Sequence, residues 1–293
     1  NALSIAGEQI TNTAGQIVST KDLGLQAETL NNSGNGIISS QAGMTVDTTR
    51  LINRDGGSVL GTGPSTVTAR EIDNTAGSLQ SAGTLTLAGL SLLDNHQGRI
   101  KANGSLSINP LSHLFIRAAS LPGLVLQNQN GEIQSGGIFS ASVQNFYNQG
   151  GILQSQQGMN LSLAQDYTHR AGETLSSNGT LTLSVAGTVT NLADWLLPGN
   201  LTLSATSIIN PASIVARTLQ LTTGSLLNTG RLDADKLSLS VDALDNNAAI
   251  MGDDVLVNGR IIDNHGSAAV IAATQSLDLQ SRERTSNRDG ALL

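Results

Sequence analysis

Apolar and polar residues alternate strictly in short segments along the chain, as in "TLTLAG" (84–89), "NLSLAQ" (160–165) and "KLSLSV" (236–241). Successive side chains of a β-strand point to opposite faces, so the two leucines of each segment share one face. Apolar residues do not recur at the three- and four-residue spacing of a helix, and glycine interrupts every candidate segment. The pattern predicts an all-β protein built from short strands and turns.

These segments belong to a longer unit that repeats about every 21 residues. Residues 72–87, "IDNTAGSLQSAGTLTL", are followed 21 residues later by "LDNHQGRIKANGSLSI" at 93–108. An anchor residue preceded two positions earlier by an apolar residue marks each copy, and such a regular period is the signature of a repeat architecture. Thirteen anchors align in this way: Asn12, Asn32, Asn53, Asn74, Asn95, Asn128, Asn148, His169, Asn191, Asn210, Asn228, Asn246 and Asn264.

A unit of this length with one apolar face cannot bury that face alone. Stacking the copies about 4.8 Å apart pairs each strand with its counterpart in the next copy and closes a continuous core. The repeat therefore predicts a parallel β-helix of about 13 coils. The interval between Asn95 and Asn128 is 33 residues long, so we expect one insertion near residues 109–120 that leaves the coil or covers its side.

Three polar features of the unit predict how the coil turns. Asparagine tolerates the left-handed backbone of a corner, and amides stacked coil on coil can form a hydrogen-bonded ladder, in which His169 replaces one asparagine. The glycine three residues later is expected to have positive φ; it occurs at Gly15, Gly56, Gly77, Gly98 and Gly131. A serine seven residues after the anchor predicts a stacked hydroxyl row of Ser19, Ser39, Ser81, Ser135, Ser155 and Ser176.

Composition narrows the classes of function. With 39% hydrophobic residues and 32 glycines in 293 residues, the chain has enough apolar material for a core, and no apolar run reaches the length of a membrane span. The absence of cysteine excludes disulfides and thiolate metal sites. A net charge of −7 with 13% charged residues leaves no basic stripe, which argues against a nucleic-acid partner. The chain opens inside a repeat, so we expect it to be a piece of a longer protein.

Stacking would bring two pairs of aspartates together, Asp73 with Asp94 and Asp245 with Asp263. Two carboxylates one strand spacing apart could form a retaining glycosidase pair or hold a cation. The alternative is a solvated outward row, because each aspartate follows an inward apolar residue and no second cluster of acids, arginines and aromatics accompanies it. The four histidines show no metal-ligand spacing. We therefore expect no enzyme activity and no cofactor, and the sequence leaves open whether the pairs hold a cation.

The unit apolar-x-Asn-x-x-Gly-x-apolar-x-Ser-x-Gly-x-Leu-x-Leu resembles the haemagglutinin repeats of filamentous haemagglutinin and of contact-dependent inhibition exoproteins. The resemblance is strong over residues 8–108, fair over 124–187 and weaker over 188–281, where the serine row fails. It implies a right-handed β-helix filament, secreted from a Gram-negative cell through a dedicated outer-membrane transporter and held at the cell surface. There it would act as an adhesin or present a toxin to a neighbouring cell. The missing cysteines agree with export of an unfolded chain.

Aromatic placement suggests where a receptor would bind. All six aromatic residues fall between 115 and 195, and Phe139, Phe146 and Tyr167 hold inward positions. Aromatics and arginine supply much of the energy of protein interfaces. The predicted receptor contacts are therefore the outward candidates and two residues beside the first of them: Phe115, Ile116, Arg117, Tyr147 and Trp195.

The expected organisation follows from these features. Residues 1–108 form a regular stalk, 109–281 a divergent continuation whose 109–200 portion contacts the receptor, and 282–293 an irregular tail or a truncated coil. The partner would be an outer-membrane protein or glycan on a neighbouring cell, and the piece itself would be a monomer. A purely structural stalk and a lectin-like, glycan-binding adhesin remain alternatives, while a polysaccharide-processing enzyme is disfavoured.

Overall fold

The computed structural model of the chain describes residues 2–110 and 123–293, and these residues contain β-strands and no helix. Parallel strands stack coil on coil as a β-solenoid of about 14 coils, which confirms the predicted parallel β-helix. The coils form two compact units. The first comprises Asn1–Leu161 with Gly172–Leu175, and the second comprises Ser162–Ala171 with Ser176–Leu293.

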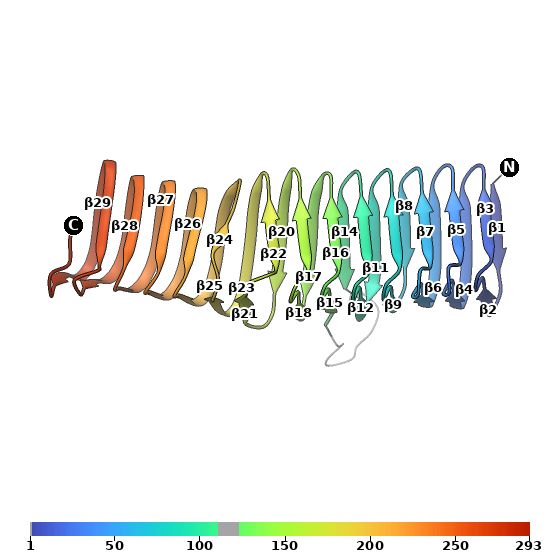
Figure 1. The fold of residues 1–293 in the computed structure, drawn as a ribbon, viewed down its shortest axis with the longest axis horizontal. Coiled ribbons are helices and arrows are strands. Elements are labelled where there is room, and N and C mark those ends of the chain that lie inside the picture. The colour runs from blue at the N-terminus through green and yellow to red at the C-terminus, as the bar shows by residue number, and fades with distance from the viewer. Residues whose placement is uncertain (1, 111–122) are drawn as a thin grey trace. The chain divides into compact units, whose positions relative to one another are not determined.

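In the first unit the strands of successive coils lie side by side (Figure 1) and belong to two hydrogen-bonded sheets. One sheet contains β1 (Leu3–Ala6), β2 (Gln9–Thr11), β4 (Leu23–Asn31), β6 (Met44–Ile52), β8 (Ser65–Thr68), β9 (Glu71–Asp73), β11 (Leu85–Leu90), β12 (Leu92–Asp94), β14 (Leu106–Pro110), β15 (Val125–Gln127), β17 (Ile138–Val143) and β18 (Asn145–Tyr147). The other sheet contains β3 (Gln16–Ser19), β5 (Ile37–Ser40), β7 (Ser58–Gly61), β10 (Ser78–Ser81), β13 (Arg99–Ala102), β16 (Glu132–Ser135) and β19 (Ile152–Ser155). The division between the units passes through β20 (Gly158–Leu163) and β22 (Thr174–Ser177).

The second unit has longer strands that bend around the coil without the glycine breaks of the first. Its strands are β21 (Tyr167–His169), β23 (Thr180–Asn191), β24 (Trp195–Leu196), β25 (Asn200–Asn210), β26 (Ser213–Asn228), β27 (Arg231–Asn246), β28 (Ala249–His265) and β29 (Val270–Arg288). The last strand exceeds the predicted count of coils, because Asn264 donates to Asn287 at 2.7 Å. The residue two positions before Asn287 is Thr285, which is polar, so the rule that requires an apolar residue at that position did not predict this coil.

The core is built by one apolar residue stacked on its counterpart in the next coil. Leu51 pairs in register with Ile72, and Ile72 with Leu93, and all three side chains are buried. Leu93 in turn pairs with Leu126, 33 residues later, so the register continues across the long interval. Most of the predicted insertion lies outside the described residues.

The predicted asparagine ladder is confirmed in both units. Each side-chain Nδ2 donates to the Oδ1 of the next asparagine at 2.7–2.8 Å, through Asn12, Asn32, Asn53, Asn74, Asn95, Asn128 and Asn148 in the first unit. The second unit repeats the pattern through Asn191, Asn210, Asn228, Asn246, Asn264 and Asn287. All of these asparagines except the exposed Asn287 are almost fully buried, and the ladder satisfies their amides apart from Oδ1 of Asn191, which follows His169.

The prediction that the anchor asparagines have left-handed backbone is wrong. Positive φ occurs two residues later, at Ala14, Ala76, Gln97 and Asn130. In the first unit the anchor directly follows the end of a strand, as Asn74 follows Asp73, and the residue with positive φ comes later in the turn. His169 pairs in register with Asn191, which confirms that it replaces an asparagine of the ladder.

The glycine after each anchor is needed for a different reason from the one predicted. Positive φ is found at Gly56 but not at Gly15, Gly77, Gly98 or Gly131. A Cβ at Gly98 would overlap the backbone oxygen of Asn74 and lie 2.7 Å from Asn95 Oδ1. Glycine is therefore required by the close approach of the ladder, since no other residue leaves room for the asparagine of the coil before.

The predicted serine row is present only in part, because Gly61 lies between Ser40 and Ser81, Ala102 lies between Ser81 and Ser135, and Ser177 rather than Ser176 bonds to its turn. Ser19 pairs with Ser40 rather than with Ser39, because the turn after Asn32 contains one extra residue. The hydroxyls satisfy turn carbonyls: Ser81 Oγ donates to Gly63 and to Thr84, both at 2.9 Å. These hydroxyls therefore help to close the turns.

Candidate interaction surface

The structure separates the predicted receptor contacts. Phe115, Ile116 and Arg117 lie outside the described residues. Tyr147, at the end of β18, points outward and is 39% exposed, so its role as a contact stays a prediction. Of the aromatics predicted to be core, Phe139 and Tyr167 are buried and Phe146 is half-buried.

The expected exposure of Trp195 is wrong, because only 2% of this residue is accessible. Trp195 pairs in register with the buried Ile214, which places it on the inward side of its coil. Its ring stacks on His169 with centroids 4.8 Å apart and an interplanar angle of 18°, and lies 6.0 Å from Tyr167. Trp195 fills the core beside the histidine that interrupts the asparagine ladder, so it is unavailable to a partner.

Tyr147 belongs to an outward row that also contains one of the aspartate pairs. Asp73 pairs in register with Asp94, Asp94 with Gln127, and Gln127 with Tyr147. One oxygen of each aspartate accepts a backbone N–H of its own turn, at 3.2 Å from Thr75 and 3.0 Å from His96. These carboxylates therefore cap turns, which is the solvated-row alternative.

Asp245 and Asp263 are also neighbours in register, but each has other partners. His265 Nε2 lies 2.8 Å from Asp245, while Asp263 accepts from Ser286 at 2.7 Å and Arg288 at 2.9 Å. Burial acts to raise the pKa of the Asp263 carboxyl, but these two hydrogen bonds hold it below 3.8. No group of three or more His, Cys, Asp or Glu side chains in the described residues could hold a metal ion.

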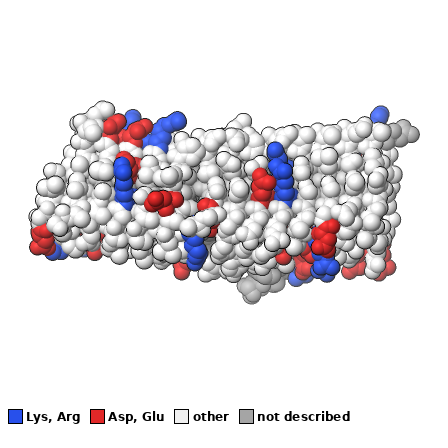
Figure 2. Space-filling model, viewed as in Figure 1, with Lys and Arg blue, Asp and Glu red and all other residues white. Residues whose placement is uncertain are grey.

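Charged groups are sparse over the rest of the surface. Figure 2 shows small mixed groups of basic and acidic side chains separated by uncharged surface on the face in view. Several are ion pairs between neighbouring coils, such as Arg99 with Glu132 at 3.1 Å and Arg260 with Asp242 at 3.0 Å. Such a surface offers little long-range electrostatic steering to a charged partner.

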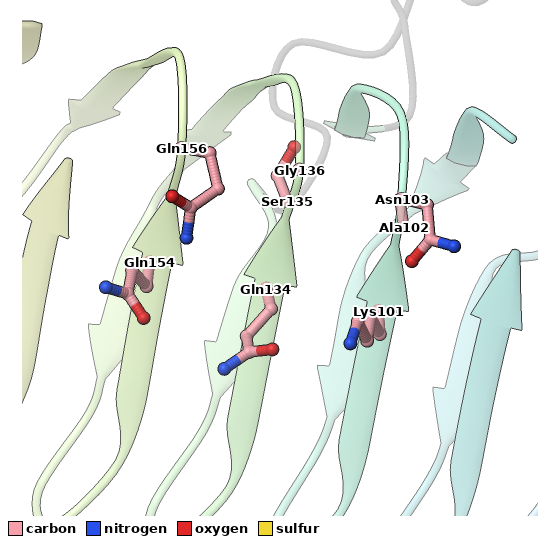
Figure 3. A pocket seen from close by; sticks show the side chains of 8 residues that line it. All are labelled: Lys101, Ala102, Asn103, Gln134, Ser135, Gly136, Gln154 and Gln156. Atoms are coloured by element: carbon pink, nitrogen blue, oxygen red, sulfur yellow. The ribbon is translucent and has the colours of Figure 1, made fainter. Parts of the chain in front are cut away.

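A hollow of about 280 Å³ opens over β13, β16 and β19 in the first unit. It is lined by Lys101, Ala102, Asn103, Gln134, Ser135, Gly136, Gln154 and Gln156. Lys101, Gln134 and Gln154 are register partners, and Figure 3 shows their side chains projecting side by side from consecutive strands. Asn103 and Gln156 lie at the turns that follow these strands.

Most of the polar groups in this hollow have no partner within the described chain. The side chains of Lys101, Asn103, Gln134 and Gln154 form no hydrogen bond or ion pair there. Lys101 is also the only charged residue that lines the hollow. The hollow therefore gathers unused donors and acceptors around a single positive charge.

Comparison with known proteins agrees with the stacked coils and the asparagine ladder. The sequence model of the haemagglutinin repeat family matches residues 1–55, 42–109, 113–194 and 199–281. The chain belongs to the haemagglutinin repeat family. It is 29% identical over 246 residues to Toxin CdiA of Escherichia coli, an alignment that covers 73% of this chain and 8% of that protein.

This haemagglutinin repeat chain thus spans a small part of the length of the relative, and the likeness supports a segment of an adhesin or CdiA-type exoprotein. No solved structure matches it. Among the described residues, no helix has the length and apolar character needed to span a membrane.

Sequence reasoning missed the hollow of this haemagglutinin repeat chain, although a signal for it was present. Gln80, Lys101, Gln134 and Gln154 all lie six residues after an anchor asparagine, so the period places them in one row. The row contains no aromatic residue, and so it lacks the feature that marked the predicted receptor contacts. Alignment of the outward positions, coil by coil, would have revealed a lysine followed by two glutamines.

Proposed function

We propose that this chain is a rigid spacer segment of a secreted filament on a bacterial cell surface, and that it presents a receptor-binding or toxin region to a neighbouring cell. The observation that carries this proposal is the parallel pairing of each coil with the next within each unit, where a hydrogen bond between buried asparagines joins neighbouring coils. Every coil adds one strand spacing of about 4.8 Å, so the number of coils sets the reach.

The outward residues support presentation more than direct contact. Trp195 is buried, and the exposed apolar residues Val18 and Leu60 are separated by the polar Ser39, although Ile209 and Leu227 form one exposed apolar pair. Interfaces depend on clustered aromatic and arginine anchors, which the described surface does not gather. Tyr147, exposed beside Gln127, favours a second candidate in which the chain itself contacts an outer-membrane protein or a glycan.

The resemblance to Toxin CdiA supports secretion through an outer-membrane transporter and a role at the cell surface. A chain without cysteine forms no disulfide that would obstruct passage in an unfolded state. A structural role is also consistent with the aspartate pairs, because their carboxylates are engaged by turn N–H groups, Ser286, Arg288 and His265.

The spacer proposal is tested by deletions within the full exoprotein. Removal of residues 72–92 joins Glu71 to Leu93, and the register of Ile72 with Leu93 means that one whole coil is lost. We expect this variant to fold, by circular dichroism and thermal melting, and to retain contact-dependent activity. Removal of 72–82 breaks the register and should abolish folding. Equal damage from the two deletions would contradict the spacer.

A second experiment distinguishes a spacer that presents another region of the exoprotein from a chain that itself contacts the receptor. Tyr147→Ala and deletion of residues 110–120 are expected to leave the activity of the exoprotein on target cells unchanged. Loss of activity in either variant, with the melting temperature preserved, would show that this chain touches the receptor.

A further inference from the structure

Four polar side chains that line the hollow over β13, β16 and β19, those of Lys101, Asn103, Gln134 and Gln154, have no partner in the described chain. Arg99 and Glu132, on the same two strands as Lys101 and Gln134, pair with each other at 3.1 Å. Lys101 and Gln134 are also neighbours in register, but their side chains form no hydrogen bond or ion pair with the described residues. In this hollow a concave surface therefore coincides with polar side chains that have no protein partner.

The chemistry of the lining restricts what could bind. A lysine ammonium supplies three donors and a charge, and each glutamine or asparagine amide both donates and accepts. Ala102 is the only apolar side chain that lines the hollow, and the other lining side chains are polar. One cation is too few for a nucleic acid or another dense polyanion, whose binding needs several basic groups. The lining matches a ligand rich in hydroxyl groups with an isolated negative charge.

We propose that this hollow binds an acidic saccharide, with a sugar carboxylate at Lys101 and ring hydroxyls at the amides of Asn103, Gln134 and Gln154. The three strands lie about 4.8 Å apart, close to the length of one sugar residue along an extended glycan. Successive sugar residues would thus meet successive coils. The volume of 280 Å³ falls just below the range of about 300–1,000 Å³ for small-molecule pockets, so it suits one or two sugar residues.

This site goes beyond the spacer, which needs no ligand of its own. It gives the side of the filament a weak affinity for acidic polysaccharide, independent of any receptor at its tip. Amide and lysine contacts on an open surface each contribute modestly, so a long glycan would need several such filaments for firm attachment.

The test is calorimetric titration of the purified chain with trigalacturonic acid, and with maltotriose as an uncharged trisaccharide. We expect saturable binding of the acid that weakens with added salt, and binding of maltotriose at least about fivefold weaker. Lys101→Ala should weaken binding of the acid about fivefold, and Lys101→Arg should largely restore it. The double variant Gln134→Ala with Gln154→Ala should weaken it about tenfold or more.

Controls are Lys236→Ala and Gln220→Ala in the second unit, where these two exposed side chains line a hollow that also contains Asp254 and Asp278 and so does not favour an acidic ligand. Neither should change the affinity, and circular dichroism must show all variants folded. Absence of saturable binding, or an equal effect of Lys236→Ala and Lys101→Ala, would overturn the proposed site. Equal binding of maltotriose would overturn its acidic specificity.

Discussion

Removal of one asparagine from the ladder should destabilise the first unit far more than removal of an exposed asparagine. Asn74 is fully buried, and its Nδ2 donates to Asn95 Oδ1 at 2.7 Å, while its Oδ1 accepts from Asn53 at 2.8 Å. In Asn74→Ala both bonds disappear. Asn53 Nδ2 keeps a second acceptor, the Ser78 carbonyl at 2.9 Å, whereas Asn95 Oδ1 loses its ladder donor.

The cost follows from what each neighbour loses. An unpaired buried acceptor costs about 1–3 kcal/mol, and the partial loss at Asn53 adds a smaller amount. The shortened side chain also leaves a void that rigid neighbouring coils cannot close, which adds about 1 kcal/mol. We therefore expect Asn74→Ala to lower the free energy of unfolding by about 3 kcal/mol.

Urea denaturation followed by circular dichroism measures this difference, with Asn160→Ala as the matched control. Asn160 is exposed and its side chain has no partner in the described chain, so its loss should change stability by less than about 0.5 kcal/mol. In Asn74→Ala, the rate of amide hydrogen exchange should increase most, relative to the parent, in the two coils that flank residue 74. A loss below about 1 kcal/mol in Asn74→Ala, or one equal to the control, would refute the idea that the ladder holds the coils together.

Three further outcomes are expected. Gly98→Ala should lower the unfolding free energy by about 2 kcal/mol or more in urea, because its Cβ meets the ladder, whereas Gly7→Ala has room and should be neutral. The hydrogen bond from Arg260 lowers the pKa of Asp242, so the ionised carboxylate stabilises the fold at neutral pH and Asp242→Asn should lower the melting temperature there. The difference in melting temperature between parent and variant should vanish as the pH falls through the native pKa of Asp242, and an equal difference in strong acid would contradict this. Trp195→Ala should cost about 3–5 kcal/mol in a denaturant titration, and a cost under about 1 kcal/mol would mean that the ring is not core.

The overall fold was predictable because the same arrangement of apolar, asparagine and glycine positions recurs in successive copies of the repeat. The anchor rule placed Ile72 and Leu93 on one inward row, and the period of two then fixed the faces of the flanking strands. Stacking identical amides is the simplest way to satisfy buried asparagines, so the ladder could be expected from the sequence alone. An atypical residue at one position does not obscure the period, because the other coils still show it.

Details within one coil were harder to predict. The pattern marks the turn but not the residue with positive φ, which proved to be Ala14 rather than Asn12. Trp195 was misplaced because the turn after Asn191 is one residue shorter than those of the first unit, and alignment with Ile214 would have put the ring inward. The hollow at Lys101 was missed because its residues are ordinary polar residues, and only their convergence on a concave surface sets them apart.

The ladder also has a direction, since every amide N–H points toward the C-terminal neighbour and every oxygen toward the N-terminal one. A chain folded only as far as Asn74 therefore ends in an unmet donor, beside a strand whose edge is ready to pair. The next coil supplies both the acceptor and the strand, so each finished coil is a template for the one that follows. Folding can then advance as vectorial growth from the N-terminus, with only one short loop to close at each step.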